Sequence, residues 1–343
     1  MNILVTGAAG YIGSIVTEEL IKKGNSVIAL DNLEQGHREA VVPETLFVHA
    51  DLRDSEELEK VFRNYQIEAV VHLAAKALVG ESMSYPESYF RTNVVYGINL
   101  LDTMLRYGVQ KLVFSSTAAI YGNSERIPIK ESHTTVPVNP YGDSKLMFER
   151  VLDWYADAHG LKFISLRYFN AAGSKDGLGE EHEPETHLIP NILKVALGQH
   201  EHVVVFGTDY PTKDGTCIRD YIHVSDIARA HILALKHLER NQDNKAYNLG
   251  NSRGYSVLEV IETARKVTGA SIPVVSHPRR PGDPAVLVAS SERAKSELGW
   301  EPEKISLEVI IESAWKWQKE HPYGYGGNKS SEKTDQIGLL EVK

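Results

Sequence analysis

The first candidate chemistry lies in the middle of the chain, where a tyrosine and a lysine are suitably spaced for acid/base work. Tyr141 and Lys145 are four positions apart, so on a helix they share one face, with the lysine one turn beyond the phenol. An ordinary phenol has a pKa near ~10, so forming the phenolate at neutral pH needs about 4 kcal/mol of help, part of which an ammonium can supply. Thr117 adds a hydroxyl after the preceding apolar run. The pair predicts an acid/base site, although Tyr-x-x-x-Lys by itself is more often an incidental pair on a surface helix.

A glycine-rich turn near the N-terminus is the second candidate. Gly7, Gly10 and Gly13 lie between the apolar run 3–5, which predicts a buried strand, and the amphipathic stretch 11–23, which predicts a helix. Glycines at such a turn let the backbone approach a ligand, and the unpaired N–H groups of a helix start suit a phosphate. The G-x-x-G-x-x-G spacing is not the commoner G-x-G-x-x-G. For the glycines alone, a tight turn without a ligand is an equal alternative.

An acidic residue gives the glycine turn more weight. Asp31 stands at the carboxyl end of the next strand-like run, 26–30, about twenty residues beyond the glycines. A carboxylate there can accept hydrogen bonds from an adenosine ribose and would repel a 2′-phosphate. Together the turn and the acid predict a dinucleotide site that favours NAD over NADP.

The elements that must position these residues alternate between strand and helix patterns through the first half of the chain. This alternation predicts an α/β fold with a parallel sheet covered on both faces. The expected strands are 3–5, 26–30, 46–49, 69–73, 111–115 and 161–166, and the expected helices are 11–23, one beginning near Ser55, 86–107 and 140–159.

After Asn170 the pattern changes. Polar loops are expected at 173–184 and 207–219. The expected helices are 187–197, 224–238, 258–267 and 307–317, and the expected strands are 203–206, 246–249 and 286–289. From Pro322 the chain is rich in glycine, serine and lysine, which predicts a disordered tail.

Composition excludes several function classes. A net charge of −9 over 343 residues argues against non-specific binding to nucleic acid or to anionic membranes. The single cysteine, Cys217, excludes an intrachain disulfide and a multi-cysteine metal site. We see neither a signal peptide nor an apolar stretch of the ~20 residues that a membrane helix needs, so we expect a cytoplasmic enzyme. The histidines show no metal-ligand spacing, and no metal is expected.

Several motifs in one order resemble a known family. The glycine turn, the acid, the hydroxyl of Thr117 and the Tyr-x-x-x-Lys pair occur in the order of the short-chain dehydrogenase/reductase superfamily, in its extended branch acting on nucleotide sugars. The downstream segments 166–170, 219–224, 247–250 and 279–283 look like the UDP-galactose (UDP-glucose) 4-epimerases. The resemblance covers about residues 1 to 321 and implies a doubly wound, Rossmann-type NAD domain with a smaller mixed α/β substrate lobe.

The resemblance assigns a role to each matching position. Tyr141 would be the acid/base, Lys145 would bind the nicotinamide ribose and lower the phenol's pKa, and Thr117 would hydrogen-bond the sugar's 4-hydroxyl. The positions that would bind NAD are Gly7, Gly10, Tyr11, Ile12, Gly13, Asp31, Asn32, Asp51, Leu52, Leu73, Ala74, Ala75, Thr92, Asn93, Tyr141, Lys145, Tyr168 and Phe169. Lys76 stands one position earlier than a lysine that many members use.

On the substrate side, the residues that match nucleotide-binding positions are Asn170, Leu188, Arg219, Arg280 and Asp283. A solvated surface charge is the alternative for each arginine. His187 falls near this site, where a helix-capping role is equally consistent. Leu287 matches a residue that lines the hexose pocket near the sugar's second carbon, where a bulky tyrosine excludes an N-acetyl group. The resemblance therefore implies that N-acetylated UDP-sugars are accepted, unless Leu287 only packs its strand.

The implied domain division is 1–170 for the NAD domain, with a return segment at about 224–250, and 171–321 for the substrate lobe. Helices 86–107 and 140–159 resemble the family's dimer-forming pair, which implies a homodimer. The implied reaction interconverts UDP-glucose and UDP-galactose through a 4-keto sugar, with NAD recycled. One rival is a sugar-nucleotide dehydratase or decarboxylase, which carries an acid just after the catalytic threonine, where this chain has Ala118. The other is a non-catalytic NAD-binding protein, which would not need Thr117, Tyr141 and Lys145 together.

Overall fold

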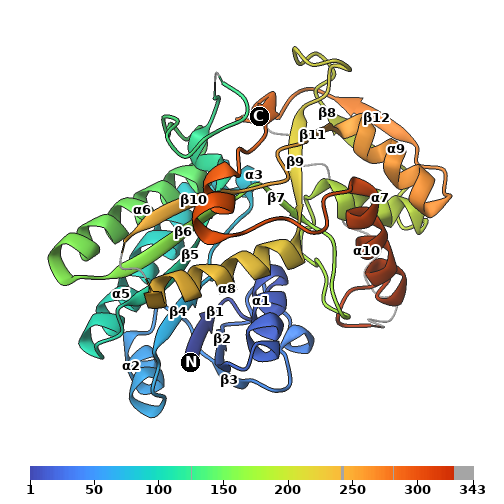
Figure 1. Ribbon diagram of the computed structural model, residues 1–343. Coiled ribbons are helices and arrows are strands. Elements are labelled where there is room, and N and C mark those ends of the chain that lie inside the picture. The colour runs from blue at the N-terminus through green and yellow to red at the C-terminus, as the bar shows by residue number, and fades with distance from the viewer. Residues whose placement is uncertain (125, 241–242, 281, 328–343) are drawn as a thin grey trace.

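A seven-stranded parallel sheet, in the order β10-β6-β5-β4-β1-β2-β3, forms the centre of the structure (Figure 1). The structure is a computed structural model, and it describes residues 1–124, 126–240, 243–280 and 282–327. The strands are β1 (Asn2–Thr6), β2 (Ser26–Asp31), β3 (Leu46–His49), β4 (Ala69–His72), β5 (Lys111–Thr117), β6 (Lys162–Tyr168) and β10 (Lys245–Leu249). The predicted α/β fold with a parallel sheet is confirmed.

Helices cover both faces of this sheet, which is why its inner strands are apolar at successive positions. On one face, Ile3 and Val5 pack in a cluster with α1 (Tyr11–Lys22) and α8 (Val224–Arg240). On the other, Leu4 lies in a second cluster that receives side chains from three helices. These helices are α2 (Ser55–Asn64), α5 (Tyr96–Arg106) and α6 (Pro140–His159). Neighbouring side chains of a strand point to opposite faces, so one strand serves both clusters.

The expected helix 86–107 is interrupted. It consists of α4 (Pro86–Phe90), a π-helical turn over Arg91–Val95, and α5, without a break in the chain. A π turn holds one more residue per turn than an α-helix, so it shifts the face that the following residues present. Asn93 lies in this turn and is buried. The chain before it forms a short helix, α3 (Val79–Ser84), and Arg38–Ala40 and Ala118–Tyr121 form single 3-10 turns.

The rest of the chain forms a second layer of short sheets and helices. One sheet holds β7 (Asn170–Ala172), β9 (Ile218–His223), β11 (Gly254–Ser256) and β13 (Val286–Leu287), and the other pairs β8 (Val203–Phe206) with β12 (Val274–His277). The helices are α7 (Leu188–Ala196), α9 (Val257–Thr268) and α10 (Leu307–Glu320), with a π turn at Ala294–Leu298. Their inner faces share one apolar cluster.

The sequence analysis predicted these short strands less accurately than the strands of the central sheet. Strands β7, β11 and β12 were not expected, and β9 begins inside the expected loop 207–219. The expected strand 286–289 is the two-residue strand β13, extended only by a bridge between Ile129 and Ala289. Strands of two to four residues carry too few positions for a period-2 pattern to be recognised.

After β7, α7, β8 and β9, the chain returns to the central sheet. Strand β10 pairs with β6 at the sheet's edge, and α8 lies against α1 (Figure 1). Trp300 is fully buried in the same cluster as α8, where its indole N–H donates to the backbone oxygen of Asp226 at 2.8 Å. The exact boundary between an NAD domain and a substrate lobe stays a prediction.

The first residues of the expected tail are ordered. Tyr325 packs on Trp317, its hydroxyl accepts the backbone N–H of Gly179 at 2.9 Å, and the backbone oxygen of Pro322 accepts from Gln199 at 2.6 Å. The prediction of disorder from Pro322 is therefore wrong for 322–327, because an aromatic ring there finds a packing partner. Residues 328–343 lie outside the described residues. Within the described chain, no helix combines the length and apolarity needed to cross a membrane.

Candidate active site

The glycine turn after β1 is built by close approaches that only glycine permits. A Cβ added to Gly13 would lie 1.9 Å from the carbonyl oxygen of Gly7, and one added to Gly7 would lie 2.6 Å from the backbone nitrogen of Ala74. Gly7 also has a φ of +73°, in the region that favours glycine. Gly10 caps α1 without a side-chain hydrogen bond, so the first N–H groups of that helix remain available to an anion.

The residues after β4 are held against this turn. The backbone N–H of Leu73 donates to the backbone oxygen of Thr6 at 3.0 Å, and that of Ala74 donates to the Thr6 hydroxyl at 3.4 Å. On the other side, the Tyr11 hydroxyl donates to the backbone oxygen of Gly173 at 2.6 Å. The turn therefore connects β1, β4 and the chain beyond β7. Ile12 lies beside it in α1, and Ala75 continues the segment after β4.

Asp31 ends β2 with a buried carboxylate that already holds two backbone amides. It accepts the N–H of Ala9 at 2.9 Å and that of Leu33 at 2.8 Å. Burial raises the pKa of Asp31, while these two hydrogen bonds act in the opposite direction. Each carboxylate oxygen has a further lone pair for a ribose hydroxyl. Asn32 donates to the Asp51 carboxylate at 2.7 Å, which places both predicted adenosine-side residues together, and Leu52 follows in the buried core.

The side chain of Asn93 forms hydrogen bonds within the protein. Its amide oxygen accepts the backbone N–H of Lys76 at 2.9 Å, and its NH2 group donates to the Lys76 backbone oxygen and to the Ser144 hydroxyl, each at 3.0 Å. Asn93 therefore fixes the loop after β4 to α6. Neighbouring Thr92 lies in the same π turn. The Lys76 ammonium lies 3.7 Å from the Glu81 carboxylate, which gives it a partner on the protein.

Thr117 and Tyr141 meet where β5 ends and α6 begins. The Asn139 side chain caps α6 by accepting the N–H of Gly142 at 2.8 Å, and a Cβ on Gly142 would lie 2.6 Å from the backbone oxygen of Ala119. The helix start is thus pressed onto the turn that follows Thr117. Burial raises the pKa of the Tyr141 phenol, whereas a hydrogen bond with the Thr117 side chain lowers it. The structure brings together the hydroxyl and the phenol that the sequence paired.

Lys145 lies behind this pair in a buried position. Its ammonium donates to the backbone oxygen of Ser115 at 2.8 Å and stands 4.9 Å from the centre of the Phe114 ring. Burial lowers the pKa of Lys145 to about 7, and the carboxylate of Glu149 acts in the opposite direction. Only 3% of Lys145 is exposed, so this cation is poorly screened by water and acts strongly on nearby groups.

A buried polar network that the sequence analysis missed supports the end of β5. The Ser116 hydroxyl donates to the Glu149 carboxylate at 2.5 Å, and Arg167 donates to the same carboxylate at 3.0 Å and to the Tyr121 hydroxyl at 2.9 Å. Tyr121 in turn donates to the Asn248 side chain at 2.7 Å. Charged residues inside otherwise apolar runs were the available signal, because such groups are rarely buried unless paired.

The two aromatic residues predicted beside the cofactor lie at the end of β6. The Tyr168 hydroxyl is hydrogen-bonded to the Ser115 hydroxyl. Phe169 belongs to a small apolar cluster that also contains Ala118, Tyr121 and Leu287. Leu287 therefore shares an apolar cluster with Ala118, the residue that directly follows Thr117.

The predicted substrate residues converge from β9 and the chain before β13. Arg219 is buried and forms an ion pair with the Asp283 carboxylate. The Arg280 guanidinium lies over the Phe206 ring, 3.9 Å from its centre, and burial lowers its pKa. Asn170 begins β7, the neighbour of β9, and Leu188 begins α7. Arg219 is therefore not a freely solvated surface charge, whereas Arg280 is exposed and is held by its contact with the Phe206 ring.

Asp220, between Arg219 and Tyr221, has a structural role that its sequence motif did not predict. Asp220 accepts the backbone N–H groups of Asn251 at 2.8 Å, Ser252 at 3.0 Å and Ala289 at 3.1 Å. Burial raises the pKa of Asp220 to about 7, against the effect of these hydrogen bonds. It ties β9 to the turn after β10 and to the end of β13.

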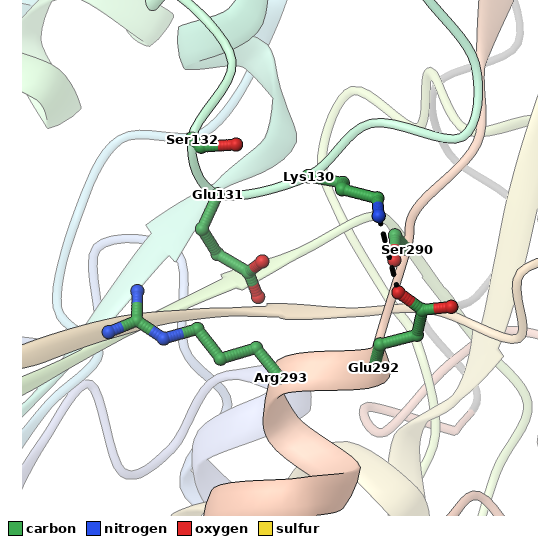
Figure 2. A pocket seen from close by; sticks show the side chains of 6 residues that line it. All are labelled: Lys130, Glu131, Ser132, Ser290, Glu292 and Arg293. Atoms are coloured by element: carbon green, nitrogen blue, oxygen red, sulfur yellow. Dashed lines mark ion pairs between the residues drawn. The ribbon is translucent and has the colours of Figure 1, made fainter.

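A shallow pocket lies apart from these residues. Figure 2 shows that it is lined by side chains of both charges, with Lys130 paired to Glu292 at 3.4 Å. Glu131 reaches the backbone N–H of Asn248 at 2.8 Å. None of the predicted site residues lines this pocket. The candidate site is therefore the group of residues at the carboxyl ends of the parallel strands, and not this hollow.

The residues present fit a dinucleotide. Gly7 and Gly13 leave no room for a Cβ, the start of α1 has no side-chain cap, and Asp31 ends the strand next to β1. The carboxyl ends of parallel strands are where doubly wound folds bind such ligands. Together with the phenol, hydroxyl and buried ammonium at the end of β5, this arrangement can transfer a proton beside a hydride carrier.

Known proteins are similar to this chain in sequence and in structure. Residues 3–250 match the NAD dependent epimerase/dehydratase family. The chain is 53% identical over 327 residues to UDP-glucose 4-epimerase of Halalkalibacterium halodurans, covering 95% of this chain and 98% of that one. A crystal structure of a UDP-glucose 4-epimerase aligns with a TM-score of 0.92 at 48% identity, covering 95% and 99% of the two chains.

A structure that holds ligands gives a further comparison. UDP-glucose 4-epimerase of Bifidobacterium longum, solved with NAD+ and UDP, aligns with a TM-score of 0.90 at 38% identity, covering 94% of this chain and all of that one. The agreement spans both the sheet with the glycine turn and the elements that carry Arg219 and Leu287. On this sequence match and this geometry, the chain belongs to the NAD dependent epimerase/dehydratase family, within its UDP-glucose 4-epimerase group.

Proposed function

We propose that this protein is an NAD-dependent enzyme that interconverts UDP-glucose and UDP-galactose by inverting carbon 4 of the hexose. The observation that carries the proposal is the meeting of Thr117, Tyr141 and Lys145 at the carboxyl end of β5, next to a glycine turn suited to NAD. Relatives that share about half of its residues bear the same activity in their names.

The cofactor would be held by the residues already placed at the sheet edge. The glycine turn and the start of α1 would face the pyrophosphate, and Asp31 would accept from the adenosine ribose. Bound NAD supplies the acceptor, and then the donor, of the hydride at carbon 4. Lys145 would contact the nicotinamide ribose from its buried position.

Tyr141 would take the proton from the 4-hydroxyl, and it would return a proton to the same oxygen when the turned 4-keto sugar is reduced on its opposite face. In the protein alone, burial holds the pKa of Tyr141 above its usual value. Burial disfavours the phenolate, whereas a positive charge nearby stabilises it. We therefore infer that the phenol is activated only in the loaded enzyme, by the combined positive charge of Lys145 and the oxidised cofactor.

Substrate binding is proposed to concentrate on the nucleotide. Arg219 and Arg280 would bind the diphosphate, with Asp283, Asn170 and Leu188 nearby. The 4-keto sugar must turn between the two hydride transfers, so the hexose must be held loosely. Binding energy placed on a remote, non-reacting part of the substrate meets both requirements.

A dehydratase or decarboxylase is the nearest alternative. Such enzymes need an acid after the catalytic threonine, and here Ala118 is part of the apolar cluster with Phe169. Incubating the purified protein with UDP-galactose, without added NAD, should yield UDP-glucose and no dehydrated or decarboxylated product. Absence of any product would favour the binding-protein alternative.

The first prediction concerns the acid/base. Tyr141→Phe should fold and retain NAD, yet lose at least about 100-fold in kcat, because positioned proton transfer typically contributes 10²–10⁴-fold. Turnover, NAD content and thermal melting should be measured on the same preparation. Activity above about a tenth of the wild-type rate would remove Tyr141 from this role.

The second prediction concerns Asp31. Asp31→Ala should lower NAD retention and relax discrimination against NADP, and it should also destabilise the fold, because two backbone N–H groups lose their acceptor at about 1–3 kcal/mol for each one left buried. Asp31→Asn is the matched control that keeps the shape and one acceptor oxygen. NAD content and selectivity that stay at wild-type values in both variants would reduce Asp31 to a structural residue.

The third prediction concerns substrate breadth. Leu287 is 9% exposed in the cluster beside Thr117, and leucine is shorter than tyrosine, so we propose that the pocket admits an N-acetyl group. Wild type should epimerise UDP-N-acetylglucosamine, and Leu287→Tyr should abolish that reaction while sparing UDP-galactose. If wild type does not turn over UDP-N-acetylgalactosamine at saturation, the substrates are limited to the plain hexoses.

The fourth prediction concerns assembly. Trp154 and Met147 on α6 are 72% and 41% exposed, and their spacing of seven puts them on one helix face. This apolar face supports the proposed homodimer. Sedimentation should give the mass of two chains, and Trp154→Glu should shift it toward one, with Trp154→Tyr as the control. A wild-type monomer at tens of micromolar would contradict the proposal.

We also propose a cytoplasmic location, which the single cysteine supports. Cell fractionation tests it.

A further inference from the structure

The loop between β7 and α7 gathers two histidines and two glutamates. These are Glu180, His182, Glu185 and His187, whose nearest ligand atoms all lie within 4.8 Å of one another. The sequence analysis expected an acidic polar loop here and no metal, because no two histidines show a familiar ligand spacing. The loop folds back on itself, and the E-x-H-x-x-E-x-H segment brings alternating donor types to one point.

The distances between the donor atoms match the edges of a tetrahedral zinc site. Zinc binds histidine nitrogen at about 2.0–2.1 Å and carboxylate oxygen at about 2.0–2.2 Å, so the ligand atoms of a tetrahedron lie about 3.3–3.6 Å apart. The Nδ1 atom of His182 is 3.5 Å from Glu185 and 3.6 Å from Glu180, and that of His187 is 3.1 Å from Glu180. Both His187 distances are shorter than this range, the 3.1 Å to Glu180 slightly and the 2.8 Å to Glu185 more clearly, at hydrogen-bond length.

The two carboxylates of this cluster are buried, and one of its imidazole nitrogens has no hydrogen bond in the part of the chain that the structure describes. The side chain of Glu180 is 10% exposed, and within the described chain its carboxylate is paired only with the two imidazoles. The Nδ1 atom of His182 is buried without any hydrogen-bond partner among the described residues. Glu185 is 2% exposed. Buried polar atoms are normally satisfied, so the unpaired Nδ1 atom of His182, which lies 3.5 and 3.6 Å from two carboxylates, points to a ligand shared by these groups.

We propose that Glu180, His182, Glu185 and His187 bind one zinc ion. Imidazole nitrogen and carboxylate oxygen are both zinc ligands, and four protein donors leave no position open, which is typical of a structural site. His187 is the residue immediately before α7. The ion would therefore fasten the loop to the first turn of α7, where the predicted substrate residue Leu188 lies.

The position of the loop explains what the metal would stabilise. The loop starts beside Gly173, whose backbone oxygen accepts a hydrogen bond from Tyr11 of the glycine turn. Further along, the backbone N–H of Gly179 donates a hydrogen bond to Tyr325, near the end of the described chain. Zinc binding would add a fixed point between the central sheet and α7. This role is independent of the proposed reaction, because no ligand belongs to the Thr117, Tyr141 and Lys145 group.

A network of ion pairs without metal is the alternative. It requires at least one imidazole to carry a proton between two carboxylates, and it would hold the same residues together. The two arrangements differ in composition, since zinc releases the proton and takes its place. Direct metal binding therefore separates them.

The experiment measures zinc in the purified, NAD-containing protein. After dialysis against a chelator and then against zinc, wild type should retain one equivalent per chain, and cobalt in its place should give the visible absorption of a tetrahedral site. His182→Ala and Glu180→Gln should each weaken zinc binding at least about 100-fold, since they remove direct ligands. Exposed His159 on α6 supplies the control, and His159→Ala should bind as wild type does.

Stability gives a second readout. A ligand that binds only the folded state raises its melting temperature, so zinc should raise that of wild type and of His159→Ala by a few degrees, and leave that of Glu180→Gln unchanged. Glu180→Gln keeps the side chain's shape, so it serves if His182→Ala fails to fold. Less than a tenth of an equivalent of zinc in wild type at 10 micromolar free zinc, or undiminished binding in both ligand variants, would overturn the proposal in favour of the ion-pair network.

Discussion

The contact between the Gly7 carbonyl and the backbone of Gly13 sets the geometry on which the rest of the structure depends. A Cβ at position 13 would stand 1.9 Å from that oxygen, so α1 can lie this close to the end of β1 only with glycine there. The same turn meets Ala74 after β4 and, through Tyr11, the chain after β7. Because parallel strands end at one edge, fixing this turn also fixes where a dinucleotide can lie relative to β5.

Burial at the end of β5 works against the chemistry that the site must perform. It raises the pKa of Tyr141 and lowers that of Lys145 to about 7, so the protein alone favours a neutral phenol and a weakened cation. The network of Ser116, Glu149 and Arg167 holds the strand end despite this cost. A site arranged in this way has little phenolate until a positive ligand is bound, and the same low-dielectric surroundings then strengthen that ligand's effect.

The sequence predicted the parts whose signal is local and repeated. Strands β1, β4 and β5 are apolar at successive positions because two helix layers cover them, and the glycine turn and Tyr-x-x-x-Lys pair are short motifs. The sequence did not predict the backbone acceptor role of Asp220, because it depends on segments that come together only in the fold. It also did not predict the π turn at Asn93 or the meeting of Glu180 with His187, because these depend on backbone geometry that no short pattern specifies. Family resemblance supplied the roles of Arg280 and Leu287, which spacing alone does not reveal.

Strands β9 and β13 hold two of the proposed substrate residues next to each other. Leu287 is the register partner of Arg219, and partners in adjacent strands lie about 4.8 Å apart. The buried arginine is fixed by Asp283, at the end of the loop leading to β13, while Leu287 packs with Phe169 and Ala118. One short sheet thus carries, as neighbours, the residue proposed to bind the nucleotide and the residue proposed to line the hexose pocket. With the roles proposed above, a larger residue at 287 would fill the hexose pocket without removing the ion pair between Arg219 and Asp283. The hexose that is accepted could then change while the nucleotide is still bound.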